Sequence, residues 1–240
     1  MKKIIHRAKT RGTAQHGWLN SSHTFSFAHY YNPERMGFGK LRVLNDDFVE
    51  GGKGFATHSH KNMEIVSIPL AGGLEHKDSM GNIHTIRTGE VQVMSAGTGV
   101  THSEYNMSQE EKVNFLQIWV LPKKKDIPPC YQQNLFDPKL RENKFQLPVT
   151  PKGTDASLCI NQDAFFSLAH IKQSVALDYQ FNAFNKSPTR GVYIFIIDGS
   201  VEINGEILHA RDAIGLLQGD DISIKAINNS DILCIEVPMN

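Results

Sequence analysis

The chain has 240 residues, and its 25 lysines and arginines balance 25 aspartates and glutamates, for a formal net charge of +0 at pH 7. This balance offers no basic face for nucleic acid, and no run of about 18 apolar residues is present to span a membrane as a helix. Three scattered cysteines exclude a disulfide framework, and the basic start MKKIIHRAKTRG lacks the apolar region of a secretory signal, so we expect a soluble, cytoplasmic protein.

Short β-rich runs separated by turn residues begin near residue 40. The runs KLRVLNDD, MEIVSIPLAGG, NIHTIRTG, EVQVMSAG and VNFLQIWVLP follow one another at a spacing typical of an all-β sandwich or barrel. Gly72-Gly73 and Gly81-Asn82 supply turns between them. This half of the chain is therefore predicted to form one β domain.

Residues 122–154 interrupt this pattern. The stretches PKKKDIPPC and LPVTPKGTD have the proline and charge content of a linker, and FDPKLREN has room for a short helix. The β pattern resumes in VYIFIIDGSVEINGEILHARDAIGLLQG, where Asn204-Gly205 is a strong signal for a two-residue hairpin turn. The predicted organisation is a first domain over residues 1–125, a linker over 126–154 and a second domain over 155–240.

The two β-rich blocks resemble each other. VSIPLAGGLEHKDSMGNIHTIRTGEVQVMSAG aligns with YIFIIDGSVEINGEILHARDAIGLLQG as a strand, a glycine turn, a hairpin and another strand. A repeat of about 100 residues indicates a tandem duplication of one β-barrel domain. Of the 11 histidines, all but His170 and His209 lie in the first half, so we expect the second domain to be structural.

Two clusters in the first block contain metal-binding residue types. In FATHSHKNMEIV, His58 and His60 are two residues apart and share one face of a strand, and an unbroken strand would bring Glu64 to that face too. In SAGTGVTHSEYN, His102 and Glu104 repeat this spacing after a glycine-rich turn. Three neutral imidazoles and one carboxylate suit a first-row metal, and four protein ligands favour an iron-like centre over closed tetrahedral zinc. The alternative for a lone histidine pair is a surface or hydrogen-bonded role.

Overlaying the two blocks shows what the second lacks. Asn185 and Ser187 fall near the positions of the paired histidines, and Ser223 falls near the position of His102. None of these side chains replaces an imidazole as a ligand. We therefore expect one metal site per chain.

Other histidines and aromatic residues have two interpretations. Those near the N-terminus either wall a pocket over the metal or, as we favour, pack in the core: His23, Phe25, Phe27, His29, Tyr30, Tyr31 and Phe38. Trp119 alternates as a barrel-lining residue and fits packing as well as a substrate contact. His76 and His84 flank the turn at residues 78–82 and are predicted to be exposed hairpin residues.

Both histidine clusters resemble cupin motifs. GKGFATHSHKNME matches the first motif, in which a glycine, here Gly52, precedes an HxH pair and a glutamate, and GEVQVMSAGTGVTHSEYN resembles the second. Together with HGWLNSSHTFSFAHYYNPERMGFGKLRVLNDD at residues 16–47, these motifs identify the chain as similar to the pirin family, especially the bacterial pirin-like quercetinases. The resemblance is strong over residues 7–122 and weak in the second domain.

The resemblance implies an all-β fold of two tandem cupin (jelly-roll) barrels, with one divalent metal in the first barrel. Pirins take their carboxylate ligand from the second motif, so the implied ligands are His58, His60, His102 and Glu104. General cupins use the glutamate of the first motif, which makes Glu64 the alternative. Fe(II) is the favoured ion, with Zn, Ni, Cu, Co and Mn as alternatives.

The resemblance also implies a metal-dependent dioxygenase similar to quercetin 2,3-dioxygenase, which cleaves a flavonol with O2 and releases CO. Glu104 would then act both as a metal ligand and as the general base for the substrate hydroxyl. The alternative is a metal- or redox-sensing binding module that modulates a transcription factor or metabolic enzyme through a protein partner. A third possibility is a zinc-dependent hydrolase or isomerase. An apolar, flavonol-sized cavity favours the enzyme, and a shallow charged site favours the module.

Overall fold

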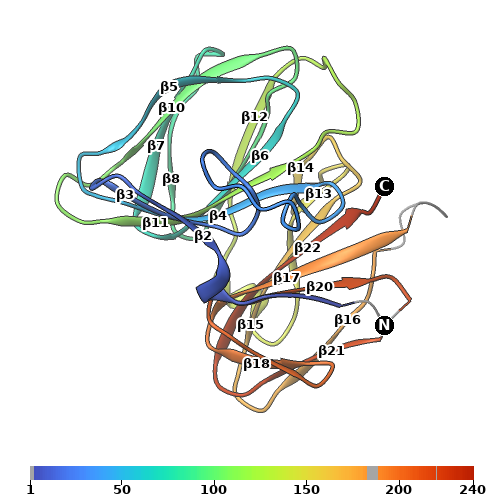
Figure 1. Ribbon diagram of the computed structural model, residues 1–240. Coiled ribbons are helices and arrows are strands. Elements are labelled where there is room, and N and C mark those ends of the chain that lie inside the picture. Colours follow the sequence, from blue (N-terminus) through green and yellow to red (C-terminus); the bar gives the residue numbers. More distant parts are fainter. Residues whose placement is uncertain (1–2, 183–188, 220) are drawn as a thin grey trace.

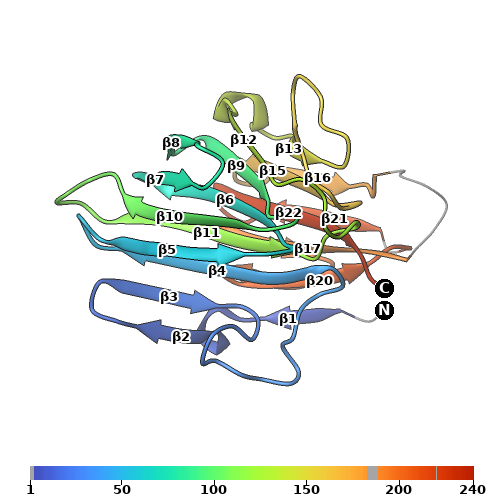
Figure 2. The ribbon, with the colours of Figure 1, turned by 90° about the horizontal axis from the view of Figure 1, so that it is seen from above.

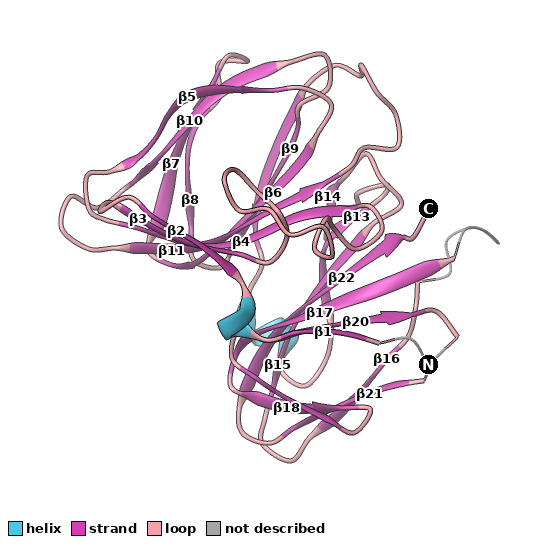
Figure 3. Cartoon of the chain, in the orientation of Figure 1, coloured by secondary structure: helices cyan, strands magenta, loops and turns pink. Residues whose placement is uncertain are grey.

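Two β barrels, each built from a seven-stranded and a four-stranded sheet, make up the molecule (Figures 1 and 3). The structure is a computed structural model that describes residues 3–182, 189–219 and 221–240. The helices within these residues are two 3-10 turns, Ala8–Thr10 and Pro138–Arg141, and none is long and apolar enough to cross a membrane. The predicted all-β fold of two tandem barrels is confirmed.

The first barrel consists of two antiparallel sheets. The larger sheet has the order β12-β9-β6-β11-β4-β3-β2, and the smaller has the order β5-β10-β7-β8. The strands of the larger sheet are β2 (Gly12–Gln15), β3 (Leu19–His23), β4 (Leu41–Val49), β6 (Glu64–Ala71), β9 (Glu90–Ser95), β11 (Val113–Val120) and β12 (Cys130–Leu135). Those of the smaller sheet are β5 (Gly54–His60), β7 (Gly73–Asp78), β8 (Ile83–Arg87) and β10 (Val100–Asn106).

The second barrel repeats this plan. Its larger sheet has the order β1-β20-β17-β22-β15-β13-β14, and its smaller sheet has the order β16-β21-β18-β19. The larger sheet contains β1 (Ile4–His6), β13 (Gln146–Thr150), β14 (Leu158–Cys159), β15 (Phe165–Ile171), β17 (Arg190–Asp198), β20 (Ala213–Leu217) and β22 (Ser230–Pro238). The smaller sheet contains β16 (Ala176–Tyr179), β18 (Ser200–Ile203), β19 (Glu206–His209) and β21 (Ile222–Ala226).

The larger sheets of the two barrels contribute to one continuous apolar core between the domains. Leu116 and Ile118 of β11 lie in this core, while Phe115 belongs to a separate cluster inside the first barrel. Strand β11 is thus buried on both faces, which explains why VNFLQIWV is almost continuously apolar. Seen from above, the strands lie in stacked layers, with β2 and β3 outermost beside β4 (Figure 2).

The interiors of the two barrels differ in polarity. The second barrel is filled by a cluster of buried apolar side chains that includes Ile194, Ile196, Val201, Leu208 and Ile224. The first barrel contains buried polar side chains, among them His102, Glu104 and Gln117. Residues 185 and 187, expected at positions equivalent to the paired histidines, lie outside the described residues.

The junction between the two domains contains strands of both barrels. The expected linker, residues 126–154, contains β12, which extends the first barrel by pairing with β9, and β13, which pairs with β15 in the second. The 3-10 turn Pro138–Arg141 lies within the predicted short helix FDPKLREN. Strand β1 pairs with β20, so the start of the chain belongs to the second barrel. The edge strand CYQQNL lacks an apolar alternation, which is why its sequence did not indicate a strand.

Candidate metal centre

The paired histidines of β5 face the second histidine cluster on β10. His102 lies directly opposite His58 in the register of the two strands. Before His58 the register shifts, because the stretch from Phe55 to His58 is one residue longer than the facing stretch from Glu104 to His102. A β-bulge of this kind redirects side chains. In a regular strand Phe55 and His58 would point to opposite faces of the sheet. The bulge allows both side chains to line the same pocket.

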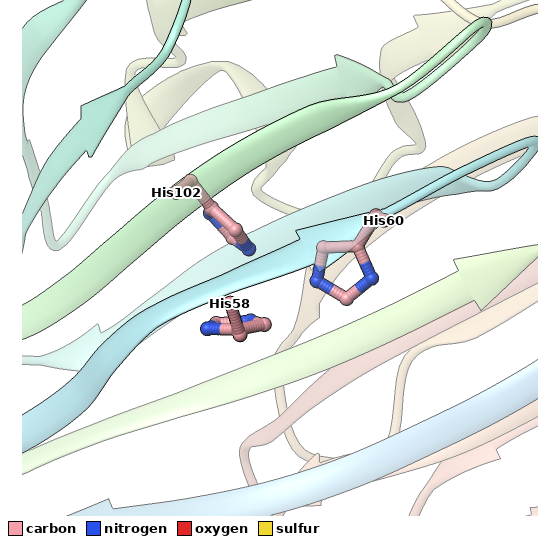
Figure 4. A group of neighbouring side chains, drawn as sticks. All are labelled: His58, His60 and His102. Carbon is pink, nitrogen blue, oxygen red and sulfur yellow. The ribbon is translucent and has the colours of Figure 1, made fainter.

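Three imidazole rings meet on one face of these paired strands (Figure 4). The ring centres of His58 and His102 are 4.4 Å apart, those of His58 and His60 are 4.8 Å apart, and those of His60 and His102 are 4.9 Å apart. One nitrogen from each ring lies within 4.8 Å of the others. The structure therefore brings the three predicted histidines together as a group able to hold one ion.

The chemical state of these rings fits a metal. The Nδ1 atom of His58 donates a hydrogen bond to the Ala56 carbonyl at 2.8 Å, which leaves the Nε2 lone pair free. The Nε2 atom of His102 is buried and has no hydrogen-bond partner among the described residues. Burial, with a smaller effect from neighbouring histidines, lowers the pKa of His60 to about 4 and that of His102 to about 3. The rings of His60 and His102 are thus neutral at pH 7, as metal ligands must be.

Glu104 is buried inside the barrel at the edge of this group. Gln117 donates a hydrogen bond of 2.9 Å to one carboxylate oxygen, and the Ser67 hydroxyl lies 3.3 Å from the other. Burial raises the pKa of Glu104 to about 7, although these two hydrogen bonds oppose the shift. A carboxylate oxygen of Glu104 lies within 4.8 Å of a nitrogen of His102 and of His76, and Glu104 lines the same pocket as His58. The carboxylate therefore adjoins the three-histidine group through His102.

Glu64 lies in a different environment. The chain turns between β5 and β6 at Asn62, which has a positive φ of 51°, so the expected unbroken strand does not exist. Glu64 instead begins β6, where its carboxylate accepts hydrogen bonds from the Ser95 hydroxyl at 2.6 Å and the Asn161 backbone N–H at 3.0 Å. Because Asn161 follows β14, Glu64 links the two domains, and it is absent from the candidate metal groups of the described residues.

His76 was expected to be exposed, and this prediction is wrong. The side chain is 1% exposed, and its Nε2 atom lies 3.0 Å from the Asp78 carboxylate. Its Nδ1 atom lies 3.5 Å from Nδ1 of His102, on the side of that ring away from the buried, unpaired Nε2. The signal for burial was the alternation in GLEHKD, which puts His76 on the same face as Leu74. His84 is exposed, as predicted.

A pocket of about 300 Å³ opens beside the histidines. Its apolar lining includes Trp18, Phe27, Phe55 and Trp119, and Trp119 packs edge-on against His60 at 4.9 Å between ring centres. Toward solvent it joins a wider depression of about 710 Å³ that shares these four aromatic side chains. Four aromatic side chains thus form one wall of the pocket.

Some of the N-terminal aromatic and histidine residues line the pocket, and others pack in the core or are exposed. Phe27 and His23 line the pocket. Phe25 and Phe38 pack in the core between the domains. His29 and Tyr31 are exposed, and the ring of Tyr30 lies against Gly12.

Comparisons with known proteins agree with this geometry. Residues 5–120 match the pirin family, and residues 147–237 match the quercetinase C-terminal cupin domain. The chain is 43% identical to the quercetin 2,3-dioxygenase of Escherichia coli (strain K12), with 98% of each chain covered. It is 37% identical to a pirin-like protein of Caulobacter vibrioides, covering 94% of this chain and 95% of that protein.

Solved structures give the same relationship. The crystal structure of the bacterial pirin YhhW in complex with nickel(II) from Escherichia coli is similar with a TM-score of 0.91 and 41% sequence identity, covering 99% of each chain. At this level of identity and coverage the likeness extends over both domains. The chain therefore belongs to the pirin family.

Proposed function

We propose that this protein is a metal-dependent dioxygenase that cleaves a flavonol with O2 and releases CO. The observation that carries the proposal is the aromatic-walled pocket of about 300 Å³ beside His58, His60 and Glu104. Its volume lies at the lower end of the range of about 300–1,000 Å³ typical of small-molecule sites. A largely apolar pocket of this kind favours an enzyme over a binding module, for which a shallow, charged site was expected. Similarity to proteins named quercetin 2,3-dioxygenase supports the same substrate class.

His58, His60, His102 and Glu104 are the proposed ligands of one divalent first-row metal in the first domain. Fe(II) is our first candidate for a centre with three imidazoles and one carboxylate, and Ni(II) is the second, because a related pirin was crystallised with nickel(II). Zn, Cu, Co and Mn are the remaining alternatives. The second domain, with its apolar interior, has a structural role in this proposal.

When bound, the metal would supply a Lewis acid that lowers the pKa of the substrate hydroxyl. Glu104 is the proposed acceptor of the hydroxyl proton, and its raised pKa of about 7 suits a group that takes up a proton near neutral pH. Gln117 and Ser67 orient its carboxylate. The aromatic wall at Phe27 and Trp119 offers faces and edges against which flavonol rings pack and from which water is excluded.

The test is anaerobic reconstitution of metal-free protein with Fe(II), and in parallel with Ni(II), followed by addition of flavonol and O2. We expect CO release equal to flavonol consumption in the loaded protein and none in the metal-free protein. His60→Ala should lose both metal and CO release. Fully loaded wild-type protein that releases no CO from any flavonol would contradict the dioxygenase proposal and favour the binding module.

A further inference from the structure

The larger sheet of the first barrel gives the pocket a polar wall. Ser21 of β3, Asn45 and Asp47 of β4 and Gln117 of β11 all line the pocket. These residues are neighbours across the sheet, since Ser21 pairs with Asp47 and Asn45 pairs with Gln117 in the strand register. The wall is therefore a continuous group of hydrogen-bonding side chains on three adjacent strands.

Alternation along β4 separates two adjacent aspartates. Asp47 faces the pocket, whereas Asp46 points to the other face of the sheet. There the Asp46 carboxylate pairs with Arg11 at 3.6 Å and with Arg211 at 3.3 Å. Asp46 is thus charge-compensated outside the pocket, and Asp47 is not.

Asp47 keeps an unused acceptor in the pocket wall. Its side chain is buried, at 4% exposure, and one carboxylate oxygen accepts a hydrogen bond from the Ser21 hydroxyl. The other oxygen has no hydrogen-bond donor among the described residues. The side-chain oxygen of Asn45, two residues earlier on the same face, is fully buried and has no hydrogen-bond partner among the described residues. A buried acceptor without a donor is costly, so the unpaired Asn45 oxygen, next to an Asp47 oxygen that accepts no bond from the protein, indicates that a ligand supplies hydrogen-bond donors at this wall.

We propose that Asp47 accepts a hydrogen bond from a second hydroxyl group of the flavonol, other than the one next to the metal ligands, and thereby selects polyhydroxylated substrates. This inference rests on the proposed function. The aromatic part of the pocket wall does not distinguish a hydroxyl group from a hydrogen atom on a flavonol ring. A site that hydrogen-bonds a substrate hydroxyl rejects the analogue that lacks it, because the buried protein group is then left unpaired.

The experiment compares Asp47→Asn with the matched control Asp46→Asn on two substrates. Quercetin carries several hydroxyl groups, whereas 3-hydroxyflavone carries only the one expected at the metal. We expect Asp47→Asn to lower the ratio of kcat/KM for quercetin to that for 3-hydroxyflavone by roughly 10-fold, the effect of losing one hydrogen bond when the single amide oxygen accepts from Ser21. Asp46→Asn should leave this ratio unchanged. Dissociation constants for both compounds can be measured from the fluorescence of Trp18 and Trp119 in the pocket. The ratio of the two constants should change by a similar factor to the ratio of kcat/KM.

A purely structural role for Asp47 would lower both kcat/KM values equally, and an unchanged ratio would overturn the inference. If wild-type protein turns over no flavonol, the proposed function fails, and the ratio of dissociation constants still decides whether Asp47 selects hydroxyl groups. Should Asp47→Asn not fold, the wild-type protein provides the test. It must prefer quercetin over 3-hydroxyflavone by about 10-fold or more, and equal preference would refute a selecting hydroxyl contact.

Discussion

Glu104 is buried between two hydrogen-bond donors, and its role as a base can be separated from its role as a ligand. In Glu104→Gln the amide oxygen still coordinates a metal but no longer accepts a proton. We therefore expect the fully metallated variant to remain slower than wild type by about 100-fold or more, the usual size of a general-base contribution. The measurement is turnover per bound metal.

Glu64→Gln is the matched control, since it makes the same change in another buried glutamate. Its carboxylate contacts Ser95 and Asn161 and lies outside the pocket, so turnover per bound metal should be retained. A fully loaded Glu104→Gln protein that works at the wild-type rate would show that Glu104 takes no part in proton transfer.

His76 lies beside the ring of His102, on the side away from the unpaired Nε2 atom. Its Nδ1 atom faces Nδ1 of His102 at 3.5 Å, and the Asp78 carboxylate fixes its other nitrogen. Removing such a support typically weakens metal binding by about 10- to 100-fold, and we expect this loss for His76→Ala. Competition with a chromophoric chelator measures it. His84→Ala is the control, because His84 pairs with His76 across the hairpin but is exposed; equal losses in the two variants would refute the supporting role.

Asp47 makes the stability of the metal-free protein depend on pH. Burial raises its pKa from the ordinary 3.8 to about 7, so the folded protein holds this proton more tightly than the unfolded chain. The resulting stability is fully present below pH 3.8 and is lost as the pH rises through about 7. Asparagine cannot ionise, so Asp47→Asn does not lose this stability. The free energy of unfolding of the variant should therefore increase relative to that of wild type as the pH rises from about 5 to about 8.

Urea denaturation of both proteins at several pH values measures this difference. Histidine titrations affect the wild type and the variant alike and cancel in the comparison. A difference in unfolding free energy that does not change with pH would show that the Asp47 carboxyl is not perturbed by burial.

At the scale of the elements, the turn between β9 and β10 determines where His102 lies. Gly97 in this turn has a φ of +46°, and a Cβ atom there would lie 2.0 Å from the Ile127 carbonyl oxygen. Gly81 also has a positive φ of +93°, but a Cβ atom there would meet nothing within 4 Å. Gly97→Ala should therefore destabilise the protein more than Gly81→Ala, which bears only the left-handed backbone cost of about 1–2 kcal/mol.

Urea unfolding of the two variants compares them directly. Gly97→Ala should also weaken metal binding, since the displaced turn leads into the strand that carries His102. Equal losses of stability in Gly97→Ala and Gly81→Ala would show that the loop at Ile127 moves to accommodate the Cβ atom without further destabilising the protein.

Period-two alternation was enough to place His58 and His60 on one face, because β5 is a regular strand over both residues, whereas the prediction that His102 joins them relied on the resemblance to the pirin motifs. It was not enough at Glu64, where the chain turns at Asn62 and the next strand joins the other sheet. That turn depends on contacts distant in sequence, such as the hydrogen bond of 3.1 Å from Asn62 to Asp126. The alternation in GLEHKD places His76 on the face of Leu74, but its contact with His102 depends on the pairing of β7 with β10, which one sequence does not display.

At the scale of the whole molecule, two similar barrels have diverged in their interiors. The second is filled by apolar side chains, and its sheets also take up strand β1 from the start of the chain. The first keeps a polar lumen with histidines and buried carboxyls. Because the domains share one apolar core between them, the second barrel stabilises the sheet that forms the polar wall of the pocket. The second barrel, whose described residues form no group able to hold a metal, can thus support the site in the first through this shared core.

One transition metal per chain is the stoichiometry expected from this division. Among the described residues, the groups able to hold a metal all lie in the first barrel and share His102. Elemental analysis after dialysis against excess metal should therefore give one ion per chain. His60→Ala should reduce this value toward zero, because two imidazoles are left, whereas His209→Ala in the second barrel should leave it at one. Metal should also raise the melting temperature of wild type but not of His60→Ala, since an ion that binds only the folded state stabilises it. Two ions per chain in wild type, with one retained in His60→Ala, would instead reveal a site in the second barrel.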